Sequence, residues 1–137
     1  VRARTAALAT ALCGVSVAAL CSDTARTAPG APPGLVRVYN AERGCREPVD
    51  PDLRCSLGLA VDPLLPYTAE NVVPTRVWHG DVLTTDCQMH GGDPVVDEED
   101  RQSTRWFRIR LPAGSGPSTA WLPAVRTREV PALPECR

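Results

Sequence analysis

The chain has 137 residues, with 15 basic and 16 acidic side chains and a formal charge of −1 at pH 7. This length leaves room for one domain with one core. The charge balance excludes the broadly basic surface that attracts nucleic acid or anionic membrane. Without residues 1–27 the chain keeps 12 basic and 15 acidic side chains, so we expect no nucleic-acid partner.

Residues 1–27 have the organisation of a secretory signal peptide. Arg2 and Arg4 precede an uncharged apolar stretch, residues 6–20, that is too short to span a bilayer comfortably. We therefore predict a secreted protein whose mature form has no membrane span. The cleavage site stays open between residues 19 and 28.

Lipidation of Cys21 is an alternative to simple cleavage, although Leu20 stands where a lipid-attachment motif has a small residue. Residues 28–44 are predicted to be a linker that ends in a first short strand. Three prolines among small residues in its first part favour an extended, solvated backbone. The domain itself is predicted to occupy residues 45–137.

Four cysteines fall in the mature part, and an even number in a small exported chain indicates two disulfides. Three pairings are possible in principle. We favour Cys45 with Cys55, which closes a short loop, and Cys87 with Cys136. The second bond would hold the C-terminus against a central strand, because the prolines of residues 128–136 prevent regular sheet pairing there.

Cys87 and His90 have a spacing that zinc sites use, and His79 lies upstream. No second close pair of ligands accompanies them, and an oxidising compartment favours a disulfide at Cys87. We therefore expect neither a metal nor another cofactor.

The remaining chain is predicted to be all-β, because short β-branched and aromatic runs alternate with turn residues. In the clearest run, residues 104–111, a period of two places Phe107, Ile109 and Leu111 on a core face. Trp106, Arg108 and Arg110 would then occupy the other face. Closely spaced strands in one small domain predict a closed or nearly closed barrel. The predicted strands are residues 35–39, 57–61, 76–78, 82–87, 104–111 and 119–122.

Two runs, VWHGDVL at residues 77–83 and DCQ at 86–88, are followed by a Trp-centred strand at 106–109 and by the run 120–122, AWL. In this order they resemble the bacterial SH3-like domains of exported proteins from high-GC Gram-positive bacteria. The resemblance covers residues from about 53 to 136, with Ala120 where the family usually has glycine. It implies a small SH3-like barrel that serves as a binding module.

Four aromatic residues are the predicted ligand-binding residues: Trp106, Trp121, Trp78 and Tyr67. Exposed tryptophans on adjoining strands could form a platform for an extended peptide or a sugar. The alternative is that at least one of them closes the end of the barrel. The expected partner is peptidoglycan or an extracellular protein segment, bound by a monomer that is associated with the cell wall.

The acidic run at residues 93–100, DPVVDEED, lacks the ligand spacing of a calcium loop and is predicted to be a solvated, mobile loop. His79, Asp81 and a serine could be combined into a triad, but no motif fixes their geometry. The candidate serines are Ser103, Ser115 and Ser118. We therefore predict that the protein is not an enzyme.

A secreted inhibitor of proteases or other hydrolases is the alternative function. Such inhibitors are also small, disulfide-braced β domains that present a rigid loop. The loop between Cys45 and Cys55 would be the binding element, with Arg46 or Arg54 offered to a pocket of the enzyme.

Overall fold

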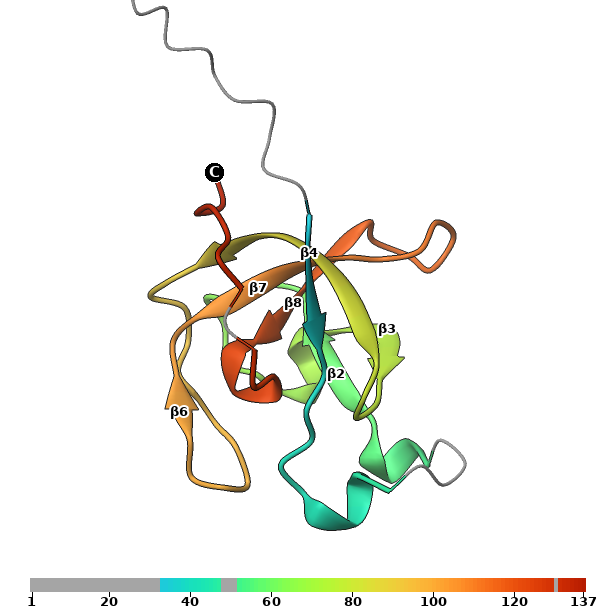
Figure 1. The fold of residues 1–137 in the computed structure, drawn as a ribbon. Coiled ribbons are helices and arrows are strands. Elements are labelled where there is room, and N and C mark those ends of the chain that lie inside the picture. Colours follow the sequence, from blue (N-terminus) through green and yellow to red (C-terminus); the bar gives the residue numbers. More distant parts are fainter. Residues whose placement is uncertain (1–32, 48–51, 130) are drawn as a thin grey trace, which may run out of the picture.

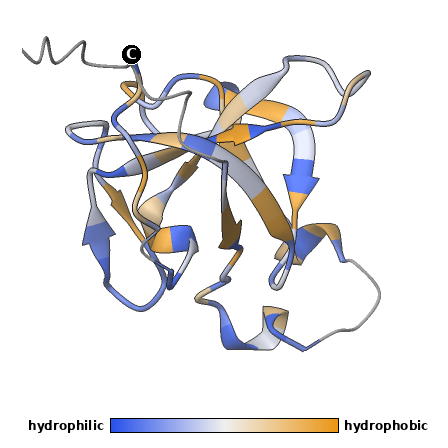
Figure 2. Cartoon of the chain, turned by 45° about the horizontal axis from the view of Figure 1, so that its top comes forward, coloured by the Kyte–Doolittle hydropathy of each residue, from blue (hydrophilic) through white to orange (hydrophobic). Residues whose placement is uncertain are grey.

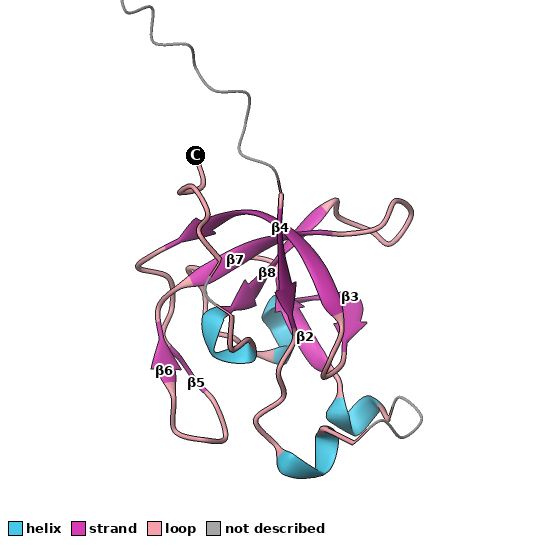
Figure 3. Ribbon diagram, in the orientation of Figure 1, coloured by secondary structure: helices cyan, strands magenta, loops and turns pink. Residues whose placement is uncertain are grey.

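A computed structural model of the chain describes residues 33–47, 52–129 and 131–137. Six antiparallel strands form one curved sheet in the order β1-β4-β7-β8-β2-β3, and β5 and β6 form a separate hairpin (Figures 1 and 3). The six strands are β1 (Gly34–Arg37), β2 (Leu57–Ala60), β3 (Val72–Val77), β4 (Val82–Met89), β7 (Trp106–Arg110) and β8 (Thr119–Pro123).

Short 3₁₀ turns and one small hairpin make up the remaining regular structure. The turns are η1 (Arg43–Cys45), η2 (Leu53–Cys55), η3 (Ala69–Asn71) and η4 (Ala124–Arg126), and the hairpin joins β5 (Val95–Val96) to β6 (Gln102–Ser103). None of the helical segments described is longer than three residues, so the all-β prediction is confirmed. No helix in the described ranges has the length and apolar character needed to cross a membrane.

The sheet is open, in contrast to the expected closure into a barrel. Strand pairings within residues 33–47, 52–129 and 131–137 leave β1 and β3 as the two edges. β3 is longer than predicted and carries the exposed Pro74, which has no N–H to offer to a further strand. The register between β2 and β3 shifts between Gly58 and Ala60, which adds curvature where the edge begins.

One face of the sheet forms the main core, as the alternation in β7 predicts. Phe107 lies opposite Leu122 and Ile109 opposite Ala120, and all four side chains are buried. Figure 2 shows hydrophobic stretches along the strands of the sheet. Leu111, the third predicted core residue, is partly buried against the same cluster. Burial of each large aliphatic or aromatic side chain contributes about 1.5–3 kcal/mol to folding.

Trp106 lies on the opposite face of β7 but is completely buried rather than exposed. Its indole Nε1 donates a hydrogen bond to the carbonyl of Asp93, 3.1 Å away. Gly92 lies so close that a Cβ there would come within 2.3 Å of the indole ring. The segment that follows β4 therefore covers this face, and Trp106 joins Val95 and Val125 in a second core.

Both disulfides form as predicted, so the favoured pairing is confirmed. The Cys45–Cys55 bond joins η1 to η2, and the Cys87–Cys136 bond fastens the C-terminal segment to β4. Beside the second bond, the backbone N–H of Gln88 donates to the carbonyl of Pro134, 2.9 Å away. The backbone N–H of Cys136 donates to the backbone carbonyl of Gln88, 2.8 Å away. The C-terminal segment thus pairs with the end of β4, along the same side of β4 that pairs with β1.

The strand at residues 34–37, which the sequence assigned to the linker segment 28–44, belongs to the same sheet as the later strands. It pairs with β4 from Gly34, opposite Thr85, to Arg37, opposite Val82. The predicted signal peptide, its cleavage site, Cys21 and the proline-rich part of the linker lie outside the described residues.

Candidate ligand-binding cleft

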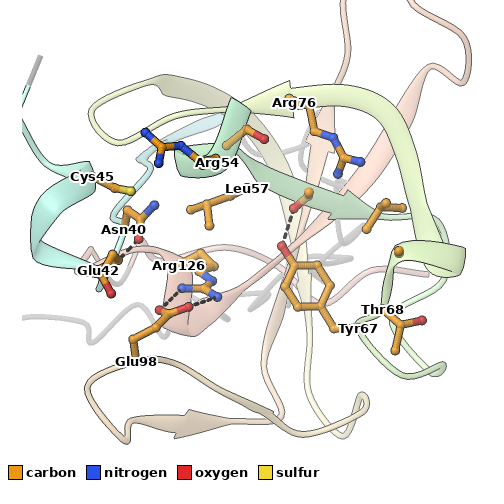
Figure 4. A pocket seen from close by; sticks show the side chains of 14 residues that line it. Asn40, Glu42, Cys45, Arg54, Leu57, Tyr67, Thr68, Arg76, Glu98 and Arg126 are labelled. Atoms are coloured by element: carbon orange, nitrogen blue, oxygen red, sulfur yellow. Dashed lines mark hydrogen bonds and ion pairs between the residues drawn. The ribbon is translucent and has the colours of Figure 1, made fainter. Parts of the chain in front are cut away.

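A cleft of about 410 Å³ opens where η2, β2, β3 and η3 meet (Figure 4). Leu57, Gly58 and Val72 are among its apolar lining, and polar groups from Asn40 and Tyr67 lie beside them. Its size falls within the range of about 300–1,000 Å³ typical of small-ligand sites. The cleft is therefore large enough for two or three residues of a peptide.

Gly58 on β2 makes the floor of the cleft. A Cβ at this position would lie 2.7 Å from Cγ1 of Val72 and 2.9 Å from an Nη of Arg76. The phenol of Tyr67 donates a hydrogen bond to the Gly58 carbonyl, 2.5 Å away. The missing side chain thus leaves room for the guanidinium of Arg76 to lie across the floor.

Two arginines supply positive charge to the cleft. Arg54 comes from η2, and its Nη2 lies 2.6 Å from Oδ2 of Asp52 in an exposed pair. Arg76 comes from the exposed face of β3, and within the described ranges it forms no ion pair. Arg76 is therefore the guanidinium that a ligand can engage without displacing a protein carboxylate.

Two glutamates supply negative charge. The carboxylate of Glu98 is held by the guanidinium of Arg126, with Nη2 3.0 Å from Oε1, and the side chain of Arg126 is only 9% exposed. Burial lowers the pKa of Arg126, but Glu98 outweighs this effect and the pKa is raised. Glu42 is exposed at the rim and forms no ion pair with a described residue.

Tyr67 is held by both the cleft and the second core. Its ring meets the indole of Trp106 edge to face, with the ring centroids 5.8 Å apart. Burial raises the pKa of the phenol, so Tyr67 remains a neutral hydrogen-bond donor at physiological pH.

Of the four predicted ligand-binding residues, only Tyr67 lines the cleft. Trp106 is buried, and Trp121 is half-buried against the same second core, so the two form no exposed platform. Trp78 does not line the cleft, but its Nε1 donates to the carbonyl of Asp52, 3.1 Å away, at the start of η2. Trp106 is buried under the segment that covers the second face of the open sheet, and not at the end of a closed barrel.

Sequence reasoning did not single out Gly58, Arg76, Glu42 or Arg126 as site residues. They come from separate turns and strands, so only the fold brings them together.

Three carboxylates of the acidic run, those of Asp97, Glu98 and Glu99, bind arginines from distant segments, so this part of the run is not the purely solvated loop that the sequence predicts. Asp97 is buried and accepts hydrogen bonds from the backbone N–H groups of Glu99 and Arg101, both at 2.9 Å. Burial acts to raise the pKa of Asp97, but these donors and Arg128 outweigh it and lower the pKa. The run therefore braces the wall from which Glu98 reaches the cleft.

The groups considered for zinc or for a triad make other contacts. Cys87 is bonded to Cys136, and Nδ1 of His90 lies 2.8 Å from the carboxylate of Glu135. His79 Nδ1 accepts a hydrogen bond from the backbone N–H of Asn40, 3.1 Å away. Within the described ranges no group of three or more His, Cys, Asp or Glu side chains could hold a metal ion.

The same holds for the remaining members of the considered triad. Asp81 accepts from the backbone N–H of Trp78 at 2.8 Å, and Ser103 Oγ accepts from that of Arg105 at 3.0 Å. The hydroxyl of Ser115 donates to the Pro112 carbonyl within its own turn. These side chains stabilise turns, and in the part of the chain that the structure describes no hydrogen bond or ion pair joins one of them to another.

The alternative function, hydrolase inhibition, depends on Arg46 or Arg54, and these two side chains differ in exposure. Arg46 binds Glu99, donates to the carbonyls of Asn40 and Ala41, and lies over the ring of Tyr39, 4.5 Å from its centroid. Arg54, in contrast, has a side chain that is 89% exposed. Only Arg54 is available to an enzyme pocket.

The fold and cleft define a small, disulfide-braced, all-β domain. No protein-family model matches the chain, and comparisons with curated proteins and with solved structures likewise give no significant match.

Proposed function

We propose that the chain is an exported, non-enzymatic SH3-like binding module that holds a peptide segment of the cell wall in the cleft above Gly58. The cleft is the observation that carries this proposal. Its lining combines apolar side chains with charged and hydrogen-bonding groups on rigid elements, which is the composition of a recognition site.

Two disulfides support export, because such bonds persist in oxidising compartments. The resemblance to SH3-like domains of exported proteins supports a wall ligand over other extracellular peptides. This step is an analogy of fold, so the experiment must test the ligand directly.

The test begins with sedimentation of the oxidised protein with purified peptidoglycan. We expect the protein to pellet with the wall material and to stay in solution without it. Titration with soluble wall peptides, followed by ¹H–¹⁵N NMR, should then shift the amides of Gly58, Tyr67 and Arg76. No pelleting, or shifts confined to the turn between β7 and β8, which does not line the cleft, would refute the proposal.

A substitution at Gly58 provides the matched variant. Gly58→Ala places a methyl group on the floor of the cleft, within 2.7 Å of Val72, and should weaken binding at least several-fold. The dispersion of the NMR spectrum establishes whether the variant is folded. Ala113→Ser is the control, because Ala113 is exposed in the turn between β7 and β8 and does not line the cleft.

Inhibition of a trypsin-like protease remains a second candidate because of one observation, the exposure of Arg54 beside the Cys45–Cys55 bond. In this case the oxidised protein should lower the activity of a panel of trypsin-like and subtilisin-like proteases at micromolar concentration. Arg54→Ala should abolish that inhibition, whereas a panel unaffected by the unmodified protein would discard the candidate.

A further inference from the structure

We infer that the cleft selects a dipolar ligand, a peptide segment that carries a carboxylate and an ammonium group within two or three residues. This inference rests on the proposed function and adds the chemical class of the ligand. Figure 4 shows the basis: Arg54 and Arg76 lie along one side of the cleft, and Glu42 and Glu98 lie along the other.

On the basic side, Arg76 is the residue that recognises the carboxylate. It lies over Gly58 rather than against an acidic side chain, and its planar guanidinium can bind both carboxylate oxygens at once. Arg54 stands on the same side, but Asp52 already binds two of its nitrogens, at 2.9 and 2.6 Å. Arg54 therefore adds positive potential, whereas Arg76 makes the contact.

On the acidic side, Glu42 is the residue that recognises the ammonium group. Both carboxylate oxygens of Glu98 accept hydrogen bonds from the guanidinium of Arg126, so the negative charge of Glu98 is largely neutralised within the protein. Glu42 has no such partner within the described ranges, and its carboxylate is exposed at the rim. The two uncompensated charges of the cleft thus have opposite signs.

The backbone that carries Glu42 is fixed relative to η2. Asn40 is 3% exposed, and its side chain bridges the two turns: Oδ1 accepts from the Glu42 amide at 3.0 Å, and Nδ2 donates to the Cys55 carbonyl at 3.1 Å. The Cys45–Cys55 disulfide adds a covalent connection. The acidic rim is therefore held in place before a ligand arrives, which lowers the entropy lost on binding.

The magnitudes explain why both charges are needed. An exposed ion pair contributes only about 0–1 kcal/mol, so either contact alone gives weak binding. Two contacts on opposite sides also fix the direction of the peptide, because a reversed ligand would place like charges together. Selection thus depends on the pair of charges rather than on net charge.

The experiment compares three capped tetrapeptides of equal length by NMR titration of the oxidised protein. The peptides are Ala-Glu-Lys-Ala, which carries both charges, Ala-Glu-norleucine-Ala, which carries only the carboxylate, and Ala-Gln-Lys-Ala, which carries only the ammonium. We expect the first to bind about two- to fivefold more tightly than either of the others, the size of one weak ion pair.

Two substitutions assign the contacts. Arg76→Gln should reduce binding of the dipolar peptide to the level of the ammonium-only peptide, and Glu42→Gln should reduce it to the level of the carboxylate-only peptide. The matched controls, Arg101→Gln and Glu47→Gln, change exposed residues that do not line the cleft and should leave the affinity unchanged.

Equal binding of the dipolar and carboxylate-only peptides would overturn the inference in favour of a simple anion site. Insensitivity of the dipolar peptide to Arg76→Gln and Glu42→Gln would overturn it as well. Failure of the proposed function looks different, because then neither wall peptides nor any tetrapeptide shifts the Gly58 and Tyr67 amides. If wall peptides shift these amides but the charge variants have no effect, only the dipolar inference is wrong.

Discussion

The guanidinium of Arg128 lies over the ring of Tyr39, 3.8 Å from the ring centroid. The same guanidinium binds Asp97 at 3.1 Å and Glu99 at 2.8 Å, so one side chain joins the C-terminal segment, the acidic run and the residues after β1. Arg46 also binds Glu99 and lies over the same ring. This network fixes the wall of the cleft that carries Glu98.

The network predicts a loss of stability in acid. Hydrogen bonds from Arg128 and Arg46 lower the pKa of Glu99 from 4.5 to about 2. Because the folded pKa lies below the unfolded one, the contribution of Glu99 is complete above about pH 4.5 and is lost as the pH falls towards 2. Urea unfolding at several pH values should show that Glu99→Gln destabilises the protein at pH 7 and that this difference shrinks towards pH 2. A difference independent of pH would contradict the role assigned to the carboxylate.

Trp106 is predicted to be the side chain on which stability depends most. Its ring is fully buried, and its Nε1 hydrogen bond to Asp93 holds the covering segment. Trp106→Ala should lower the free energy of unfolding by about 3–5 kcal/mol, measured by chemical denaturation. Val96→Ala is the control, because Val96 is 55% exposed and should change stability by less than about 0.5 kcal/mol. A small effect at Trp106 would show that the ring is not packed as described.

Asn71 is predicted to organise the turn that precedes the cleft. Its Oδ1 accepts from the Asp62 amide at 3.0 Å, and its Nδ2 lies 2.8–3.2 Å from the carbonyls of Asp62, Leu65 and Pro66. Asn71→Ala should lower the free energy of unfolding by about 1–3 kcal/mol, because buried backbone groups lose their partners. Calorimetry of Asn71→Ala and of Glu70→Ala, an exposed neighbour, would separate this effect from a change in turn propensity.

The two disulfides should differ in their contributions. The Cys87–Cys136 bond joins residues 49 positions apart, and the Cys45–Cys55 bond joins residues 10 positions apart. From these separations, loop entropy predicts stabilisation of about 4 kcal/mol for the first bond and about 3 kcal/mol for the second. Replacing Cys87 and Cys136 by serine should therefore destabilise the domain more than replacing Cys45 and Cys55. Urea denaturation of the two double variants measures the order, and the reverse order would show that local strain or residual structure outweighs chain entropy.

The sequence by itself determined the all-β class, the core face of β7 and both disulfides. The alternation of Phe107 and Ile109 with polar neighbours fixes which face is buried, because side chains alternate along a strand. The disulfides were predictable because only three pairings were possible and the prolines before Cys136 favoured a covalent tie to a central strand. These features follow from local pattern and from counting.

The tertiary structure alone decided the site. Trp106 alternates with the core residues, and its burial follows only from a segment that folds over the second face of the sheet. Arg76 and Glu42 come from segments 34 residues apart in the numbering, and nothing local relates them. Register shifts, covering segments and long-range ion pairs depend on how distant parts of the chain pack together, and the period of a single strand carries no information about that packing.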